Sequence, residues 1–357
     1  MKNKEQICDK TMKFEECELA ILRSAVDKAE ERMAKKNVNT PIVKQLIEIV
    51  ENFLSKKKLI CYGGTAINNI LPTHDQFYDL DVEIPDYDFF SPTPLEHAKE
   101  LADIYHKAGF EEVEAKAGVH YGTFKVFVNF IPVADITLLD KNIFNSIKKD
   151  TISISGILYS PPNFLRMLAY LELSRPAGDV SRWEKVMKRL SLLNTHYPMT
   201  TEKCNYSNYQ RTFDSNNKEL VTKLYEVTKQ SFINQGVIFF GGFASFLYSQ
   251  YMNKSVRNKF TEQPDFDILS ENAHKTCIIL KERLNDADIN DVSIVKRPSL
   301  GEIIATHYEV RVGKDTIAFV YEPLSCHSYN VITIGKNKIK VATIDTMLSF
   351  YLAFIYA

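Results

Sequence analysis

The stretch Pro85–Ser91, which reads Pro-Asp-Tyr-Asp-Phe-Phe-Ser, returns in the second half of the chain as Pro264–Ser270, Pro-Asp-Phe-Asp-Ile-Leu-Ser. Each copy follows an apolar run that ends in two glycines, Gly63-Gly64 and Gly241-Gly242. Two glycines between an apolar run and an Ala-containing segment indicate a strand, a tight turn and a helix. Because these features recur in the same order, the sequence predicts two copies of one α/β unit.

Further features of the sequence extend this repeat. His120-Tyr121 is echoed by His307-Tyr308, and Phe164-Leu165 by Met347-Leu348. Alternating side chains over 123–139 predict two strands. The remaining periodicity predicts helices at the N-terminus (Leu19, Leu22, Val26, Ala29, Met33), after Thr40-Pro41, and over 94–108, 164–173 and 183–193. The chain also stops inside the helix that matches 164–173, which raises the question of whether its C-terminus is complete.

The composition of the 357 residues is that of a packed protein with room for two domains, with 45% hydrophobic and 25% charged residues. The net charge of -1 excludes a globally basic nucleic-acid coat, so any nucleic acid must bind a local patch. The six scattered cysteines, none in a Cys-x-x-Cys pair, argue against a zinc ribbon or a disulfide framework and favour a reducing compartment. The longest apolar stretch, 347–357, is too short to span a bilayer.

The carboxylates of the repeated stretch suggest a metal site. Asp86 and Asp88 are two residues apart, so on a strand both point to one face, where a divalent cation would relieve their repulsion. Asp135, in the apolar run Ile131–Ile136, is the candidate third ligand, since a charge there is costly unless it is paired or metal-bound. Three such carboxylates suit two Mg²⁺ ions and displacement at phosphorus. Asp79 and Asp81 form a rival pair without an echo in the second half.

The glycine turn is the candidate phosphate site. Gly63 and Gly64 let the backbone approach a phosphate, and Thr65 offers a hydroxyl beside the free amides of the following helix. Each motif alone is usually structural, a turn or a solvated loop. Their combination, order and echo favour a metal-nucleotide site.

With these motifs on one chain, the sequence resembles the nucleotidyltransferase fold of the DNA polymerase β type. More narrowly, it is similar to the poly(A) polymerase catalytic subunits of large cytoplasmic DNA viruses, the giant-virus, asfarvirus and poxvirus group. The similarity rests on Gly63–Ala66, Pro85–Pro92 and Ala134-Asp135. The fold that it implies is α/β (α+β), a tandem pair of nucleotidyltransferase domains with a helical N-terminal segment and a helical connector. We expect the N-terminal segment over 1–58, the catalytic domain over 59–203 and a degenerate second domain over 204–357.

The resemblance implies template-independent addition of AMP from ATP to RNA 3′ ends, with release of pyrophosphate. It implies two Mg²⁺ or Mn²⁺ ions held by Asp86, Asp88 and Asp135, and ATP as the substrate. It also implies a place in the host cytoplasm or virion, without a membrane. Poxvirus relatives work with a processivity subunit and giant-virus relatives look able to self-associate, so a homodimer and a partner subunit both stay open.

Basic residues supply further candidates. Lys125, on a strand next to the metal site, can reach a phosphate, although an outward-facing lysine is equally compatible with the sequence. The cluster that begins at Arg175 also looks like family sequence, and we expect Arg175 to contact the nucleotide. Its other members are candidates for RNA binding: Arg182, Lys185, Lys188 and Arg189. The alternative for this cluster is a solvated amphipathic helix with Trp183 in the core.

The second copy departs from the pattern. Phe243 stands in place of Thr65, and Glu322 is the candidate for the third carboxylate by its distance from the His-Tyr pair. We expect this half to be structural or to guide RNA, although Asp265 and Asp267 keep a second metal site open. Two other functions also remain: a nucleotidyltransferase that modifies a small molecule or protein, and a non-enzymatic RNA-binding subunit.

Overall fold

The computed structural model describes residues 13–14, 17–18, 20–26, 40–78, 84–199, 218–258, 260, 264–301 and 303–357. The chain divides into two compact units. The first comprises Met1–Leu138 and Thr151–Ser160, and the second comprises Leu139–Asp150 and Pro161–Ala357. Helices α5 (Lys141–Lys148), α6 (Pro162–Leu173) and α7 (Trp183–His196) thus group with the second unit. The domain boundaries predicted from the sequence divide the chain differently and stay a prediction.

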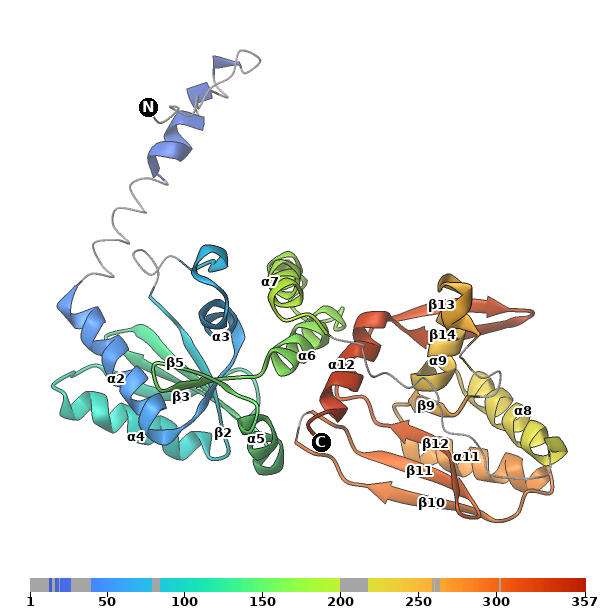
Figure 1. Cartoon of the computed structure of the whole chain (residues 1–357). Coiled ribbons are helices and arrows are strands. Elements are labelled where there is room, and N and C mark those ends of the chain that lie inside the picture. Colours follow the sequence, from blue (N-terminus) through green and yellow to red (C-terminus); the bar gives the residue numbers. More distant parts are fainter. Residues whose placement is uncertain are drawn as a thin grey trace. The chain divides into compact units, whose positions relative to one another are not determined.

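Helix α2 (Pro41–Lys57) precedes the first sheet in the chain (Figure 1). Its start is fixed by Thr40, whose hydroxyl accepts a hydrogen bond from the Val43 amide at 3.3 Å, and by Pro41, which fits the first turn. It ends at Lys58, which adopts the left-handed conformation with φ 55°. The buried side chains of one stripe, Val43, Leu46, Val50, Phe53 and Leu54, hold it in the core.

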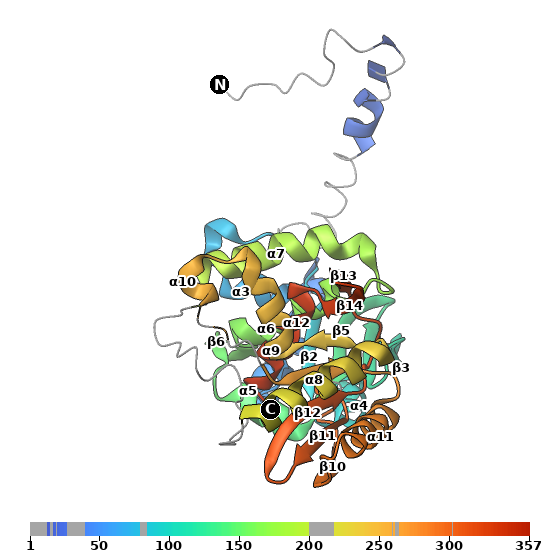
Figure 2. The same ribbon diagram turned by 90° about the vertical axis from the view of Figure 1, so that its right-hand side faces the viewer.

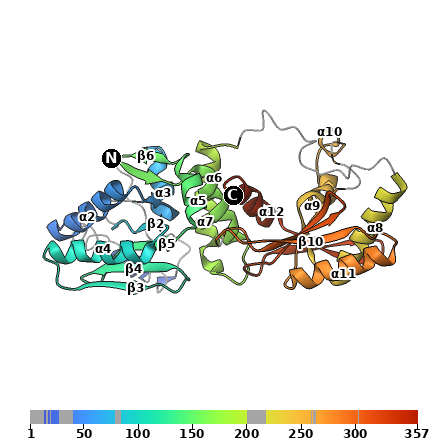
Figure 3. The ribbon, with the colours of Figure 1, turned by 90° about the horizontal axis from the view of Figure 1, so that it is seen from below.

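The first unit is built on a sheet of seven strands in the order β3-β4-β5-β2-β1-β7-β6. Its strands are β1 (Ile60–Cys61), β2 (Tyr87–Ser91), β3 (Val113–Ala117), β4 (Thr123–Val128), β5 (Ile131–Leu138), β6 (Ile152–Ile154) and β7 (Ile157–Tyr159). Helix α3 (Gly63–Ile70) follows β1 directly, and α4 (Pro94–Lys107) lies along β4 and β3 (Figure 3). The strand, glycine turn and helix predicted at Gly63-Gly64 are confirmed.

The second unit repeats this sheet strand by strand, in the order β10-β11-β12-β9-β8-β14-β13. Its strands are β8 (Ile238–Phe240), β9 (Phe266–Leu269), β10 (Val292–Arg297), β11 (His307–Val312), β12 (Asp315–Tyr321), β13 (Tyr329–Ile334) and β14 (Asn337–Ala342). Its helices match as well: α8 (Lys218–Gln235), α9 (Gly241–Tyr248), α11 (Ala273–Asp286) and α12 (Ile344–Phe354) correspond in order to α2, α3, α4 and α6. The predicted duplication and the mixed α/β class are confirmed.

Strand register corrects one detail of the predicted repeat, the position that matches the third carboxylate. In the first sheet Asp135 pairs with Asp88, and in the second Phe319 pairs with Asp267, so Phe319 occupies the position of Asp135. The prediction that Glu322 supplies the third carboxylate is therefore wrong. The error arose from the His-Tyr echo: His307 begins β11, whereas His120 lies in the loop before β4.

Each sheet is covered by helices whose buried side chains form the core. In the first unit Leu101 and Tyr105 of α4 are fully buried, together with Val126 and Ile136 of the sheet. In the second unit Phe232 of α8 contacts Phe239 and Phe266. Helix α11 packs on β10, β11 and β12, as Figure 2 also shows.

Other sequence expectations meet the structure only in part. Residues 20–26 are helical, with Leu22 and Val26 exposed, whereas Leu19, Ala29 and Met33 lie outside the described residues. Cys61, Cys277 and Cys326 carry free thiols, but Cys17 is disulfide-bonded, which differs from the reduced state that the sequence predicts. Within the described ranges, no helix combines the length and apolar character needed to cross a bilayer.

Candidate active site

The glycine turn between β1 and α3 is shaped by close contact with Asp88. Gly63 has a φ of +71°, a conformation that side chains with a Cβ rarely adopt. A Cβ added to Gly63 would lie 2.5 Å from Oδ2 of Asp88, which is closer than atoms can approach. The turn therefore requires glycine twice over, for its backbone angle and for the carboxylate beside it.

Thr65 joins the same turn to the strand that carries the aspartates. Its side chain is buried, and its hydroxyl donates a hydrogen bond of 2.7 Å to the backbone carbonyl of Asp86. This bond fixes the start of β2 against the first turn of α3. Contact between Thr65 and a phosphate stays a prediction. The contact that the hydroxyl makes here serves to position Asp86.

Two of the three predicted carboxylates, Asp88 and Asp135, lie on neighbouring strands, and Asp86 lies directly before β2. Asp88 pairs with Asp135 across the parallel strands β2 and β5, and Asp86 precedes Asp88 by two residues. Since paired residues of adjacent strands point to the same face of a sheet, Asp88 and Asp135 lie on one face. Asp86 is close enough to Asp135 and Lys125 for their charges to change its pKa. The rival residues Asp79 and Asp81 fall outside the described residues.

Lys125 is the basic residue of this face. It pairs with Asp135 across β4 and β5, and its ammonium donates a hydrogen bond to Oδ2 of Asp135. Partial burial lowers the pKa of Lys125, but this hydrogen bond and the negative charges of Asp135, Asp86 and Asp88 outweigh burial and raise it. The lysine thus interacts with all three carboxylates.

The surroundings of Asp86 disfavour the charged form of its carboxyl group. The residue as a whole is exposed, yet the protein packed around its carboxyl group raises the pKa of Asp86, and the charge of Asp135 raises it further. Lys125 acts in the opposite direction. A cation placed between Asp86 and Asp135 would remove this repulsion.

The donor chemistry of the face fits divalent ions. Asp135 is only 14% exposed, and among the described residues nothing donates a hydrogen bond to its buried Oδ1. Carboxylate oxygens are the ligands that Mg²⁺ prefers. The described residues nevertheless contain no group of three His, Cys, Asp or Glu side chains drawn together as a ligand set. The ammonium of Lys125 competes with a metal ion for the Asp135 carboxylate.

Tyr62, at the end of β1, is a neighbour of the carboxylates that sequence reasoning missed. Its hydroxyl lies 2.8 Å from the Thr137 hydroxyl, and its ring stacks on Phe90 with centroids 3.9 Å apart. Burial, followed by the charge of Asp88, raises the pKa of the Tyr62 phenol. Its position directly before Gly63 could have identified Tyr62 as a site residue. An aromatic residue at a strand end beside a glycine turn lies next to any ligand that the turn binds.

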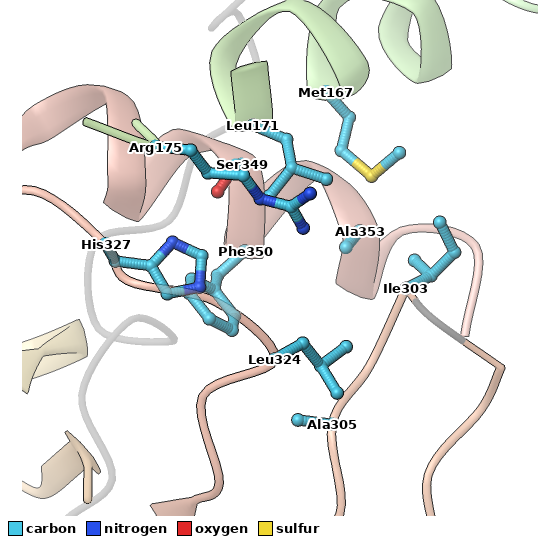
Figure 4. Close-up of a pocket in the computed structure, with 10 residues that line it drawn as sticks. All are labelled: Met167, Leu171, Arg175, Ile303, Ala305, Leu324, His327, Ser349, Phe350 and Ala353. Atoms are coloured by element: carbon cyan, nitrogen blue, oxygen red, sulfur yellow. The ribbon is translucent and has the colours of Figure 1, made fainter. Parts of the chain in front are cut away.

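Arg175 belongs to the second unit. With Met167 and Leu171 of α6 it lines a small cavity that also includes His327 and Phe350, shown in Figure 4. Burial and the charge of Arg175 lower the pKa of His327 to about 4. A nucleotide-binding role for Arg175 stays a prediction.

The other basic residues of the cluster differ in their surroundings. Arg182 pairs with Glu172 at 3.4 Å, and Lys188 with Glu184 at 2.7 Å, both as exposed ion pairs. Lys185 is exposed, whereas Arg189 is buried. RNA binding by these four residues stays a prediction, and for the buried Arg189 a structural role fits better.

Arg166 in α6 is a structural residue that the sequence did not reveal. It is fully buried and donates hydrogen bonds to Asn163, to Asn194 at 2.7 Å and to the carbonyls of Leu193 and Tyr197. These bonds tie α6 to the C-terminal end of α7. The periodicity of α6 placed Arg166 among apolar residues, which was the one available signal.

The second copy keeps two aspartates but replaces their surroundings. Phe319 occupies the position of Asp135, and Glu309, which pairs with Phe319, occupies that of Lys125. By their equivalent places in the turn, Phe243 replaces Thr65. Three of the chemical groups that surround Asp86 and Asp88 are therefore absent around Asp265 and Asp267.

Comparison with known proteins gives this face of the first unit a context. A family model described as "Poly(A) polymerase catalytic subunit" matches residues 48–179, which include all three carboxylates and the glycine turn. A "Putative poly(A) polymerase catalytic subunit" of African swine fever virus (strain Badajoz 1971 Vero-adapted) is 34% identical over 171 residues, 46% of this chain. A protein of the same description from Acanthamoeba polyphaga mimivirus is 35% identical over 161 residues, 43% of this chain.

The chain is shorter than these relatives, for the matches span 36% of the asfarvirus protein and 26% of the mimivirus protein. Among solved structures, the crystal structure of the Megavirus polyadenylate synthase matches 99% of this chain and 71% of its own, with a TM-score of 0.79 and 22% identity. That likeness shows the shared fold over both copies. Together the matches confirm the resemblance indicated by the sequence.

Proposed function

Residues 48–179 form a domain of the poly(A) polymerase catalytic subunit family, and on this premise we propose that the chain is a template-independent polynucleotide adenylyltransferase. It would transfer AMP from ATP to the 3′ end of RNA and release pyrophosphate. The observation that supports this most is the pair Asp88 and Asp135 on one sheet face, with Asp86 directly before the strand and a glycine turn beside Asp88, within the segment that the family model matches.

The roles of the residues follow from their positions. Asp86, Asp88 and Asp135 would hold two divalent ions, which when bound lower the pKa of the RNA 3′ hydroxyl and neutralise the triphosphate. Gly63 leaves room for the Asp88 carboxylate beside the turn, and Thr65 fixes the backbone of Asp86. Lys125 holds Asp135 and can turn its ammonium toward a phosphate, because its side chain is 37% exposed. Catalysis of this kind depends on positioning and charge neutralisation, and it needs no side-chain nucleophile.

The second copy would serve as a non-catalytic domain, and the direct test compares equivalent aspartates. Purified chain is incubated with a labelled RNA primer, Mg²⁺ or Mn²⁺ and each nucleoside triphosphate in turn. We expect extension with ATP by the parent and by Asp265→Asn and Asp267→Asn. For Asp86→Asn and Asp88→Asn we expect a loss of at least about a hundredfold, the effect of removing one group that stabilises transition-state charge.

Three other outcomes of this assay would contradict or change the proposed function. A parent that extends no primer with any nucleotide contradicts the proposal. Equal losses from both pairs of variants would show that the second copy also takes part in the chemistry. Transfer to a small molecule or protein in place of RNA would favour a nucleotidyltransferase of another class, which shares the carboxylates.

A further inference from the structure

Helix α11 packs on one face of β10, β11 and β12, and the opposite face meets α12 at Tyr321, whose ring lies 6.2 Å from the ring of Phe350 and 6.0 Å from that of Phe354. Tyr308 of β11 contacts His274 of α11 at a centroid distance of 5.2 Å, so the even-numbered side chains of β11 point toward α11. His307, Glu309 and Arg311 therefore lie on the opposite face. Phe319 pairs with Glu309 and shares that face, which corresponds to the carboxylate face of the first copy.

A buried carboxylate organises two arginines on this face. Glu309 is only 4% exposed and accepts hydrogen bonds from Nε and Nη2 of Arg297 at 3.1 and 2.7 Å. It also accepts bonds from Nε and Nη2 of Arg311 at 2.7 and 2.9 Å, and from the Thr316 hydroxyl at 2.5 Å. Burial raises the pKa of Glu309, but these bonds outweigh burial and lower it to about 2. The carboxylate therefore stays charged throughout the physiological range.

Arg297, Arg311 and Glu309 together keep a net positive charge at the surface. Two guanidinium groups and one carboxylate leave one uncompensated positive charge, and the arginine side chains are 46% and 35% exposed. A guanidinium has five N–H donors, so each arginine keeps donors beyond the two that bind Glu309. Because both groups are already held in place by the carboxylate, little side-chain entropy remains to be lost when an anion binds.

Aromatic rings lie beside these cations. The ring of His307 stacks on Tyr321 at 4.6 Å and lies 5.8 Å from the ring of Phe319. His307 and Phe319 are half-buried, so part of each ring is accessible. Burial, with a smaller effect of the nearby Arg297, lowers the pKa of His307, and at neutral pH this residue contributes a ring and no charge.

We propose that this face of the second unit, comprising Arg297, Arg311, His307 and Phe319, binds single-stranded RNA. The arginines would contact successive phosphates, and the rings would offer a surface for a base, the combination by which proteins hold single strands without reading their sequence. The inference rests on the proposed function, which supplies RNA as the polymer to be held. It explains why the position of a metal-binding carboxylate is occupied by a phenyl ring in this copy.

The test measures RNA binding separately from catalysis. The full chain is titrated against a fluorescein-labelled single-stranded RNA of about 20 nucleotides, longer than the site of one binding domain, and anisotropy is followed at several salt concentrations. The test variant is R297Q/R311Q. Its matched control is K296Q, because Lys296 is an exposed cation of the same strand that pairs with Tyr308 and so points to the α11 side.

We expect R297Q/R311Q to bind at least about tenfold more weakly at low salt, since each arginine makes charge-assisted bonds. The slope of log K against log[salt] should fall in magnitude by about 1.4, or about 0.7 for each lost phosphate contact. K296Q should match the parent. The triple variant R297Q/E309Q/R311Q, which leaves no unpaired buried charge, should bind as weakly as the double variant while its Tm stays near that of the parent.

Folded arginine variants with the affinity and salt slope of the parent would overturn the proposal. The result stays distinct from a failure of the proposed function. A parent that binds RNA through these arginines but transfers no AMP refutes the proposed activity and leaves the binding face standing. If the parent extends the primer and the arginine variants bind RNA normally, the proposed activity stands and the binding face is refuted.

Discussion

The ammonium of Lys125 donates a hydrogen bond to Oδ2 of Asp135, its partner across β4 and β5. The same carboxylate that is expected to hold a metal ion is thus already neutralised by a lysine. The lysine offsets the repulsion between neighbouring carboxylates, and binding of an ion must displace or share the lysine contact.

Removal of Lys125 should therefore strengthen metal binding. In K125Q we expect Mn²⁺, titrated without nucleotide and followed by electron paramagnetic resonance, to bind up to about fivefold more tightly, because a partly exposed ion pair contributes up to about 1 kcal/mol. The control is K116Q, since Lys116 pairs with Lys125 on the neighbouring strand and forms its ion pair with Glu114. Equal Mn²⁺ affinities in the parent and in K125Q would show that the lysine does not compete.

The Gly63 turn should tolerate no side chain. In Gly63→Ala both the φ of +71° and the contact with Asp88 are violated, so we expect about 1 to 3 kcal/mol of lost stability together with loss of activity. Gly109→Ala separates the two effects, because Gly109 also has a positive φ, +96°, but nothing lies within 4 Å of its added Cβ. Denaturant unfolding measures the stability of the two variants, and primer extension measures their activity. Full activity in Gly63→Ala would contradict the role given to the turn.

Asp86 should reduce stability at neutral pH. Its pKa is raised above 3.8, the ordinary value of a solvent-exposed Asp, so the folded state binds its proton more tightly than the unfolded state. Stability therefore decreases as the pH rises from about 3.8 through the folded pKa. Asp86→Asn removes this penalty, and we expect a gain at pH 7 of under about 1 kcal/mol, because the residue is exposed and screened. The gain, measured by thermal unfolding, should vanish toward pH 3; a gain that is constant with pH would refute its electrostatic origin.

Arg166 should contribute to the stability of the second unit through its buried hydrogen bonds. Arg166→Met would leave Asn163, Asn194 and the Tyr197 carbonyl without their donor, and we expect a loss of about 3 kcal/mol. Arg182→Met removes an exposed ion pair and should change stability by less than about 0.5 kcal/mol. Chemical denaturation compares the two. A loss of similar size in both would mean that the buried hydrogen bonds are not the cause.

The sequence was sufficient to predict the doubled fold because two rare local patterns, the glycine turn and the Asp-x-Asp strand, recur in the same order. The helices were visible from periodicity and from start signals such as Thr40-Pro41, which α2 confirms. The short strands β6 and β7 were not predicted. Such short runs carry too little periodicity to distinguish a strand from a loop.

Strand register was the part of the site that could not be predicted. Counting from His307 assigned the third carboxylate to Glu322, whereas pairing places Phe319 opposite Asp267. Hydrogen bonding between strands, which is not visible in sequence spacing, decides which side chains face each other. The contacts of Lys125 and Tyr62 were hidden for the same reason, since both depend on partners from other strands.

The identical strand order of the two sheets has a consequence for folding. A chain that carries the same topology twice can exchange equivalent strands between its halves, a typical misassembly of repeated domains. The divergence between the copies opposes this error. If β11 took the place of β4, Glu309 would face Asp135, two carboxylates in direct apposition, and β4 beside β12 would set Lys125 against the ring of Phe319. The differences between Lys125 and Glu309, and between Asp135 and Phe319, would therefore make exchanged strands less stable than the native pairs.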